Sequence, residues 1–112
     1  MVAGYIPDRG DIVWLDFSPQ RGHEQAGLRP ALVLSPKDYN QKSELMLACP
    51  ITTRPKGYPF EVKIKTGKID GVVLADQVKS LDWQSRKPKF TALASSETVS
   101  QTQRAIEILL KG

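Results

Sequence analysis

The stretch PFEVKIK, residues 59–65, alternates strictly between apolar and polar side chains. In an extended chain, Val62 and Ile64 project to one side, while Lys63 and Lys65 project to the other. A period of two is the pattern of a strand that is buried on one face and solvated on the other. The segment therefore predicts a half-buried β-strand and makes a β fold the starting hypothesis.

Other short apolar segments have the features of strands, because glycines and prolines separate them along the chain. Eight glycines and eight prolines are spread between these segments. The segments are DIVWLDF (11–17), PALVLS (30–35), LMLACPI (45–51), GVVLADQVKSLDW (71–83), which forms one long bent strand or two, and KFTALA (89–94). Many short strands joined by glycine and proline turns favour a sandwich or a small barrel, so the fold class is mainly β.

The last part of the chain changes from the strand period to the helix period. Apolar side chains at helical spacing predict one amphipathic helix from about 96 to 110, laid on the sheet by its apolar stripe. Ser95 or Ser96 can cap its start, and Gly112 ends it. The stripe consists of Val99, Ile106, Leu109 and Leu110, with Thr102 between them.

The length and composition fit one compact domain that spans residues 1–112. No apolar run approaches the roughly 18 residues that a membrane-spanning helix needs. The N-terminal MVAGYIPDRGD lacks the basic-then-apolar pattern of an export signal. The one cysteine, Cys49, lies in an apolar run and has no partner for an internal disulfide, which suits a reducing compartment. We expect a cytoplasmic protein that makes no membrane contact.

Positive charge is gathered in two segments, although the formal net charge is only +4. Residues 54–68 carry five lysines and arginines against Glu61 alone, and residues 79–89 carry four against Asp82 alone. Segments of one sign create a field that attracts a polyanion such as a nucleic acid. The same segments could equally be solvated hairpin tips, and charge alone leaves both interpretations open.

The sequence lacks the signatures of several classes of enzyme. One histidine and one cysteine, far apart in the chain, provide no zinc-binding spacing. The carboxylates that could hold magnesium form no tight signature; they are Asp8, Asp11, Asp16, Glu24 and Asp76. No Walker, dinucleotide-binding or Gly-x-Ser-x-Gly motif occurs. We therefore expect neither a metal site nor a cofactor.

The segment GHEQAGLRP, residues 22–30, offers acid–base chemistry. Cleavage of RNA without metal needs a base for the 2′-hydroxyl proton, a cation for the phosphorane charge and a proton donor for the departing 5′-oxygen. Glu24 and His23 are candidate bases. Arg29 is the candidate cation, because its planar fork matches two phosphate oxygens. Thr52, in ITTRP after an apolar strand, offers a hydroxyl.

Taken by themselves, these residues favour a structural interpretation. Arg29 would be a surface arginine paired with Glu24, and Thr52 would cap a turn. Because polarity and fold class do not fix function, the nuclease hypothesis needs a further observation.

Five strings in register supply that observation. They are GDIVWLDF near the start, EQAGLRPALVLS (24–35), PITT (50–53), KGYPFEV (56–62) and ADQVKS (75–80). In this order and at this spacing, they resemble the MazF/PemK family of toxin endoribonucleases over nearly the whole chain. Each string alone is a weak signal, whereas five together are specific.

The resemblance implies a fold and an activity. The family fold is a small, strongly bent antiparallel barrel-like sheet of the SH3-like, CcdB/PemK type with a C-terminal α-helix. Members are homodimers that bind single-stranded RNA in a groove at the dimer interface. They act as mRNA interferases: they cut RNA at short sequences without metal and leave 2′,3′-cyclic phosphate and 5′-hydroxyl ends. Each is paired with a MazE-like antitoxin whose acidic C-terminal segment orders along the groove.

The resemblance also assigns roles to residues. The catalytic arginine corresponds to Arg29, the catalytic threonine to Thr52, and Glu24 is a further contributor. The RNA-binding positions that follow are Phe17, His23, Gln25, Thr53, Arg54, Lys56, Asp76, Gln77 and Lys79. The family usually has a small residue at the position of His23, so we expect this histidine to be a loop residue or a base contact rather than the general base.

Two other functions remain as alternatives. The CcdB toxins share this fold and poison DNA gyrase by binding it, partly through a C-terminal Trp-Gly-Ile. This chain ends in Leu-Leu-Lys-Gly and carries both Arg29 and Thr52, which favours the nuclease. The second alternative is an RNA-binding barrel without catalysis, and the intact pair of Arg29 and Thr52 argues against it.

Overall fold

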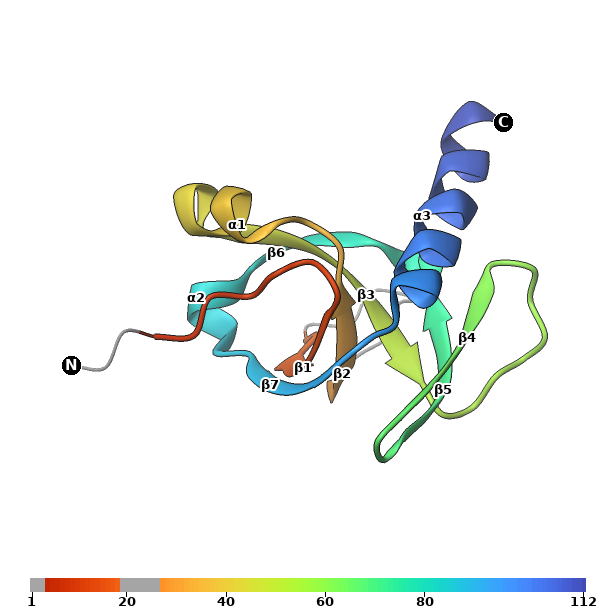
Figure 1. The fold of residues 1–112 in the computed structure, drawn as a ribbon, viewed down its shortest axis with the longest axis horizontal. Coiled ribbons are helices and arrows are strands. Elements are labelled where there is room, and N and C mark those ends of the chain that lie inside the picture. Colours follow the sequence, from red (N-terminus) through yellow and green to blue (C-terminus); the bar gives the residue numbers. More distant parts are fainter. Residues whose placement is uncertain (1–3, 19–26) are drawn as a thin grey trace.

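The computed structural model describes residues 4–18 and 27–112, and in this part of the chain it is mainly β (Figure 1). The strands are β1 (Asp11–Asp16), β2 (Leu28–Val33), β3 (Leu45–Thr52), β4 (Glu61–Thr66), β5 (Ile69–Leu74), β6 (Lys79–Asp82) and β7 (Lys89–Leu93). The helices are α1 (Lys37–Ser43), α2 (Trp83–Arg86), α3 (Ser96–Lys111) and the short 3₁₀ turn η1 (Ala75–Gln77). This confirms the predicted fold class: a bent antiparallel sheet with a C-terminal helix.

Strand β3 is the point where the sheet bends. The strand order is β4-β5-β3-β2-β1-β7, and β6 also pairs with β3. The first half of β3 pairs with β6, where Ala48 lies opposite Lys79, and its end pairs with β5, where Thr52 lies opposite Val72. One long strand thus belongs to two antiparallel ladders, and the sheet curls around it (Figure 1).

The two faces of the curled sheet bury two separate apolar clusters. One includes Val13, Leu15, Ala31 and Met46, the other Ile12, Leu32 and Ile51. Alternate residues of a strand point to opposite faces, so neighbours such as Ile12 and Val13 enter different clusters. The second cluster is the one that α3 covers, through side chains such as Val99 and Ile106.

The alternation in residues 59–65 is confirmed. Val62 and Ile64 are buried, while Lys63 and Lys65 are exposed. The segment 71–83 resolves into two strands, because η1 separates β5 from β6. Two short helices, α1 and α2, had no counterpart in the sequence prediction; each is too short to show a helical apolar stripe.

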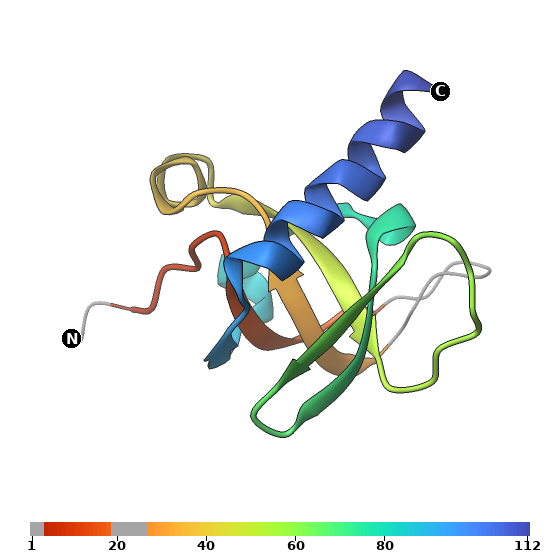
Figure 2. The same cartoon turned by 45° about the vertical axis from the view of Figure 1, so that its right-hand side comes forward.

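Helix α3 begins and ends where the sequence predicted, but its apolar stripe packs on the sheet only as far as Ile106. The Ser95 hydroxyl accepts a hydrogen bond from the Thr98 N–H, and Gly112 ends the helix in the left-handed region. The distal part projects past the sheet (Figure 2). Leu109 and Leu110 are therefore 45% and 82% exposed, which corrects the expectation that the whole stripe packs on the sheet.

Asn40 in α1 ties three distant segments together. Its fully buried side-chain amide donates to the carbonyls of Pro7 and Ser35, at 2.8 and 3.0 Å, and accepts from the Ser35 hydroxyl at 2.6 Å. The backbone carbonyl of Asn40 accepts a hydrogen bond from the Trp83 indole N–H at 2.9 Å. The Ser35 hydroxyl in turn accepts from the Leu47 N–H. Every polar atom of this small network is paired within the protein.

We expect Asn40→Ala to lower the free energy of unfolding by about 3 kcal/mol, because it leaves buried carbonyls without donors and opens a cavity. Urea denaturation measures this loss. Gln41→Ala, at the exposed next position of the same helix, is the matched control and should change stability by less than about 0.5 kcal/mol. A loss for Asn40→Ala no larger than that of the control would contradict the role assigned to the network.

Across residues 4–18 and 27–112, none of the helices has both the length and the apolar character that spanning a bilayer demands.

Candidate functional site

The start of β2 and the end of β3 meet at one mouth of the curled sheet, and this brings Arg29 near Thr52. The two strands are antiparallel, with Ala31 opposite Pro50. Continuing this register by two residues on each strand sets Arg29 beside Thr52. Both residues line a hollow of about 590 Å³, together with Trp14 and other side chains.

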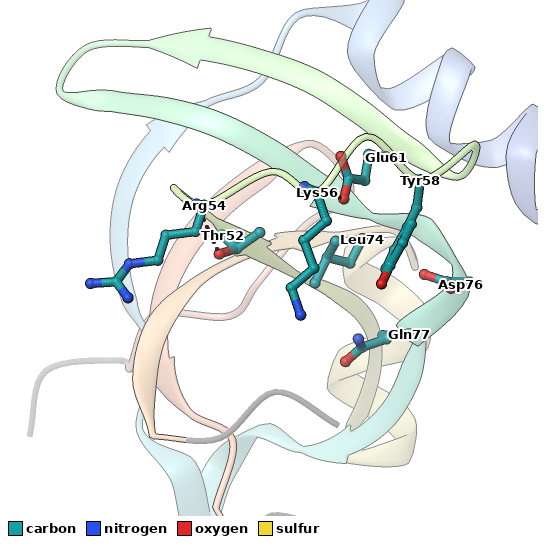
Figure 3. Close-up of a pocket in the computed structure, with 8 residues that line it drawn as sticks. All are labelled: Thr52, Arg54, Lys56, Tyr58, Glu61, Leu74, Asp76 and Gln77. Atoms are coloured by element: carbon teal, nitrogen blue, oxygen red, sulfur yellow. Dashed lines mark hydrogen bonds between the residues drawn. The ribbon is translucent and has the colours of Figure 1, made fainter. Parts of the chain in front are cut away.

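A second hollow adjoins the first. It has a volume of about 370 Å³ and shares Thr52, Arg54 and Lys56 with the first hollow (Figure 3). Its far wall consists of Tyr58, Glu61, Leu74, Asp76 and Gln77. Because three residues belong to both hollows, the two form one continuous groove, which we call the Thr52 groove.

The position of Thr52 depends on a glycine in the next strand. A Cβ atom added to Gly71 would lie 2.2 Å from the Thr52 carbonyl oxygen, so β5 can approach β3 here only without a side chain. The Thr52 hydroxyl accepts a hydrogen bond from the Arg54 N–H at 3.1 Å. A hydroxyl that accepts this bond still has its own proton to donate to a ligand.

The segment between β3 and β4 adds two cations to the groove besides Arg29. Arg54 and Lys56 are exposed, and the Tyr58 ring is 60% exposed over the second hollow (Figure 3). Such an arrangement combines positive charge with an aromatic face, which together suit single-stranded nucleic acid.

The ADQVKS segment divides between the groove and the sheet. Asp76 and Gln77 lie in η1 and line the second hollow. Lys79 begins β6 opposite Ala48 and lines neither hollow of the groove. Thr53 lines the first hollow. Most of the described residues predicted to bind RNA are therefore brought together in one place.

Phe17 requires a correction. The sequence analysis placed it among the RNA-binding residues, but its side chain is only 2% exposed and packs with Val13 and Leu15 in the core. Its N–H donates to the Gly27 carbonyl at 3.0 Å. The ring is thus unavailable to a ligand, because the alternation of β1 continues for one more residue and turns it inward. The predicted site residues His23, Glu24 and Gln25 lie outside the described residues.

The lysines and arginines of the two basic segments, 54–68 and 79–89, do not all lie at the Thr52 groove. In the first, Arg54 and Lys56 line the Thr52 groove, whereas Lys65 lines another hollow on the outer face of β4. In the second, Lys87 and Lys89 line a hollow beside Trp83 that shares no residue with the groove. The fold therefore splits the first charge run, because Arg54 and Lys56 lie in the segment between β3 and β4, whereas Lys65 lies in β4 itself.

Cys49 has no place in the chemistry of the groove. It is fully buried, and desolvation followed by the nearby Asp76 charge raises the pKa of its thiol to about 12. It is therefore a neutral core side chain at neutral pH, as its apolar neighbours in the sequence predicted. Among the residues that the structure describes, no group of three or more histidine, cysteine or carboxylate side chains is arranged to hold a metal ion.

The sequence analysis missed several groove residues, and three of them have aromatic or charged side chains. Trp14 is 39% exposed and lines the first hollow, while Tyr58 and Glu61 line the second. Tyr58 and Glu61 belong to the string KGYPFEV, so the resemblance already contained their positions. Trp14 stands in the solvent-facing register of β1, and tryptophan is enriched at interfaces, so this position is a signal for a binding surface.

The comparisons with known proteins all lead to one protein family. The model of the PemK-like, MazF-like toxin family of type II toxin–antitoxin systems matches residues 8–110. The endoribonuclease toxin MazF of Escherichia coli strain K12 is 47% identical over 110 residues, covering 98% of this chain and 99% of that protein. The endoribonuclease toxin ChpB of the same strain is 37% identical, covering 93% of this chain and 94% of that protein.

Solved structures agree with the sequence matches. The crystal structure of MazF from Deinococcus radiodurans superimposes with a TM-score of 0.92 at 50% identity, over 96% of this chain and 99% of that one. A MazE–MazF complex from the same organism gives a TM-score of 0.85 at 48% identity, over 96% and 98% of the two chains. The chain therefore belongs to the PemK-like, MazF-like family of toxins of type II toxin–antitoxin systems.

Proposed function

We propose that this protein is the toxin of a toxin–antitoxin pair and acts as an endoribonuclease that cuts single-stranded RNA at short specific sequences. One observation carries the proposal: Arg29 and Thr52, from two different strands, line the same hollow of a cationic groove. The related MazF and ChpB proteins of Escherichia coli, which are named endoribonucleases, support the same reaction class.

The proposed reaction needs no nucleophile from the protein. The 2′-oxygen of the RNA forms a new bond to the adjacent phosphorus, and the bond from phosphorus to the 5′-oxygen breaks. The 2′-hydroxyl proton passes to a base, and the 5′-oxygen gains a proton as it leaves. The products are a 2′,3′-cyclic phosphate and a 5′-hydroxyl, and this exchange of one ester for another requires neither a metal nor a cofactor.

Arg29 and Thr52 take the electrostatic part of this reaction. The Arg29 guanidinium would donate to the phosphoryl oxygens, whose negative charge grows in the transition state. The Thr52 hydroxyl, held by the Arg54 N–H, would donate to one of the same oxygens. Glu24 remains the proposed base on sequence grounds alone.

The rest of the groove would bind the RNA chain. Arg54 and Lys56 would contact phosphates, while the exposed face of Tyr58 would stack on a base. Asp76 and Gln77 offer hydrogen-bonding groups for base edges in the same hollow. Lys79 and Thr53 would extend these contacts at the rim.

The proposed partners follow from the same surface. We propose a homodimer with the groove at the subunit interface, and a MazE-like antitoxin whose acidic segment competes with RNA for the cations. MazE–MazF complexes from Deinococcus radiodurans provide the structural precedent for such a partner. A protein that cuts messenger RNA would act in the cytoplasm.

The test is cleavage of an end-labelled single-stranded RNA of known sequence in EDTA. We expect cutting at a small set of sites at the same rate with and without EDTA, since the 2′-hydroxyl and the side chains supply all reacting groups. The upstream fragments should resist 3′-end ligation until the cyclic phosphate is opened and the remaining phosphate is removed to leave a 3′-hydroxyl. A strict requirement for added magnesium would contradict the mechanism.

The same assay separates the alternatives. A non-catalytic barrel would retard the RNA in a gel without cutting it. A gyrase poison would leave RNA intact and instead trap gyrase on DNA in a supercoiling assay. Either result in place of cleavage would replace the proposed function.

A further inference from the structure

The Thr52 groove contains a carboxylate that the proposed reaction does not use. Glu61, the first residue of β4, lines the second hollow between the cations and Asp76. A negative charge in a groove for a polyanion weakens RNA binding on electrostatic grounds. Its presence in such a groove calls for a physical explanation.

The hydrogen bonds of Glu61 provide one. Its Oε2 accepts from the Lys56 backbone N–H at 2.9 Å, and its Oε1 accepts from the Gly57 backbone N–H at 3.0 Å. Bonds from N–H groups to a charged carboxylate are stronger than those to a neutral acceptor. Both oxygens are thus engaged by the loop, and the Lys56 side chain runs away from Glu61 into the groove (Figure 3).

Backbone hydrogen bonds hold Glu61 itself in place. The Glu61 N–H donates to the Tyr58 carbonyl at 3.2 Å, and the Ala75 N–H donates to the Phe60 carbonyl at 3.1 Å. Glu61 pairs with Leu74 in the β4–β5 ladder. The carboxylate is therefore fixed to the sheet, while the loop it holds projects over the groove.

We propose that Glu61 is a positioning residue: its carboxylate clamps the backbone at residues 56 and 57, so that Arg54, Lys56 and Tyr58 stand over the bound RNA. This inference rests on the proposed function for its substrate, but the clamp itself is a property of the free protein. Gly57 takes part, since its φ of +79° turns the chain directly after the N–H that it donates to Glu61, a conformation that favours glycine.

The clamp predicts an effect opposite in sign to that of charge alone. Glu61→Gln removes a negative charge beside the RNA, which by itself should tighten binding. The amide also presents an N–H₂ group to one of the two loop N–H donors, which breaks that hydrogen bond. If positioning dominates, KM for RNA rises about tenfold and kcat changes by less than about threefold, because contacts made equally in ground and transition states are lost.

Glu107→Gln is the matched control, because it removes the same charge from the exposed distal part of α3. It should leave KM and kcat at their parent values. A fall in KM for Glu61→Gln, or no change, would overturn the proposal. A loss confined to kcat would also overturn it, since Glu61 would then act in the chemical step.

A second variant tests the clamp without changing charge. Gly57→Ala forces a residue with a Cβ into positive φ, whereas nothing crowds that Cβ within 4 Å. We expect the same rise in KM. Gly67→Ala is its control, because Gly67 also has positive φ and open surroundings, but lies in the β4–β5 turn. Equal effects of the two alanine variants would count against the proposal.

Hydrogen exchange of the free protein separates this inference from the proposed function. In Glu61→Gln, the Lys56 and Gly57 amides should exchange at least about tenfold faster, while amides in β3 and β5 keep their rates. Unchanged exchange at residues 56 and 57 would rule out the clamp even if the protein cuts RNA. If the parent protein cuts no RNA but the two amides lose protection, the clamp stands and the proposed function fails.

Discussion

Replacing Arg29 with alanine is expected to lower the rate of RNA cleavage by two or more orders of magnitude. Arg29 lines the first hollow of the groove with Thr52, and the proposed reaction sets its guanidinium against the charge that grows on the phosphoryl group. Loss of one such transition-state donor typically costs a factor of about 10²–10³. Single-turnover cleavage of a labelled RNA measures this loss directly.

The variants at Arg29 also test geometry. Arg29→Lys keeps the charge but loses the planar fork, so it should recover only part of the rate. Thermal melting of Arg29→Ala should stay close to that of the parent, because Arg29 is only partly buried at the groove. A large fall in melting temperature with little specific loss of rate would instead assign Arg29 a structural role.

Thr52 should behave in the same way, with its hydroxyl as the group that matters. Thr52→Val matches the shape but has no proton to donate, so it should lose about as much rate as Thr52→Ala. Thr52→Ser keeps the hydroxyl, and also the acceptor for the Arg54 N–H, so it should keep most of the activity. Equal losses for the serine and valine variants would show that shape, rather than the hydroxyl, is needed.

The second large effect concerns the substrate. An RNA with a single 2′-deoxynucleotide on the 5′ side of the cut is expected to resist cleavage at that bond completely. The nucleophile of the proposed reaction is that 2′-oxygen, and no side chain replaces it. Gel analysis of the modified RNA measures the effect. A second, unmodified site in the same RNA serves as an internal control and should be cut at its usual rate.

Binding of the modified RNA should be nearly unchanged, to within about threefold, since phosphate contacts dominate affinity. The complex with this RNA would then be stable enough for structural work. Continued cutting at the deoxy position would mean that water is the nucleophile, and Arg29 and Thr52 would then serve a different reaction.

Much of the fold could be predicted from local patterns. The alternation of Val62 and Ile64 with Lys63 and Lys65 identifies β4, because a strand places successive side chains on opposite faces. The change to helical spacing after Ser95 identifies α3 for the same kind of reason. Because these signals are local, they identify β4 and α3 without any knowledge of which strands pair.

The approximate composition of the site could also be predicted, although only from five strings considered together. Arg29, Thr52, Arg54 and Lys56 each look like ordinary surface or turn residues when taken singly. Their common order and spacing carried the prediction that they share a groove, and the described structure places all four around the two adjoining hollows.

The sequence by itself thus determined the periodicities, the β class, the C-terminal helix and its caps. Only the tertiary structure decided the burial or exposure of residues whose surroundings come from distant parts of the chain. Phe17 is core because side chains of β2 and β3 cover the side to which it points, Leu110 is exposed because the sheet ends before α3 does, and Gly71 is required because Thr52 lies against it. The physical reason is that burial and close approach depend on contacts between strands far apart in the chain, whereas a local pattern reports only the direction in which each side chain points.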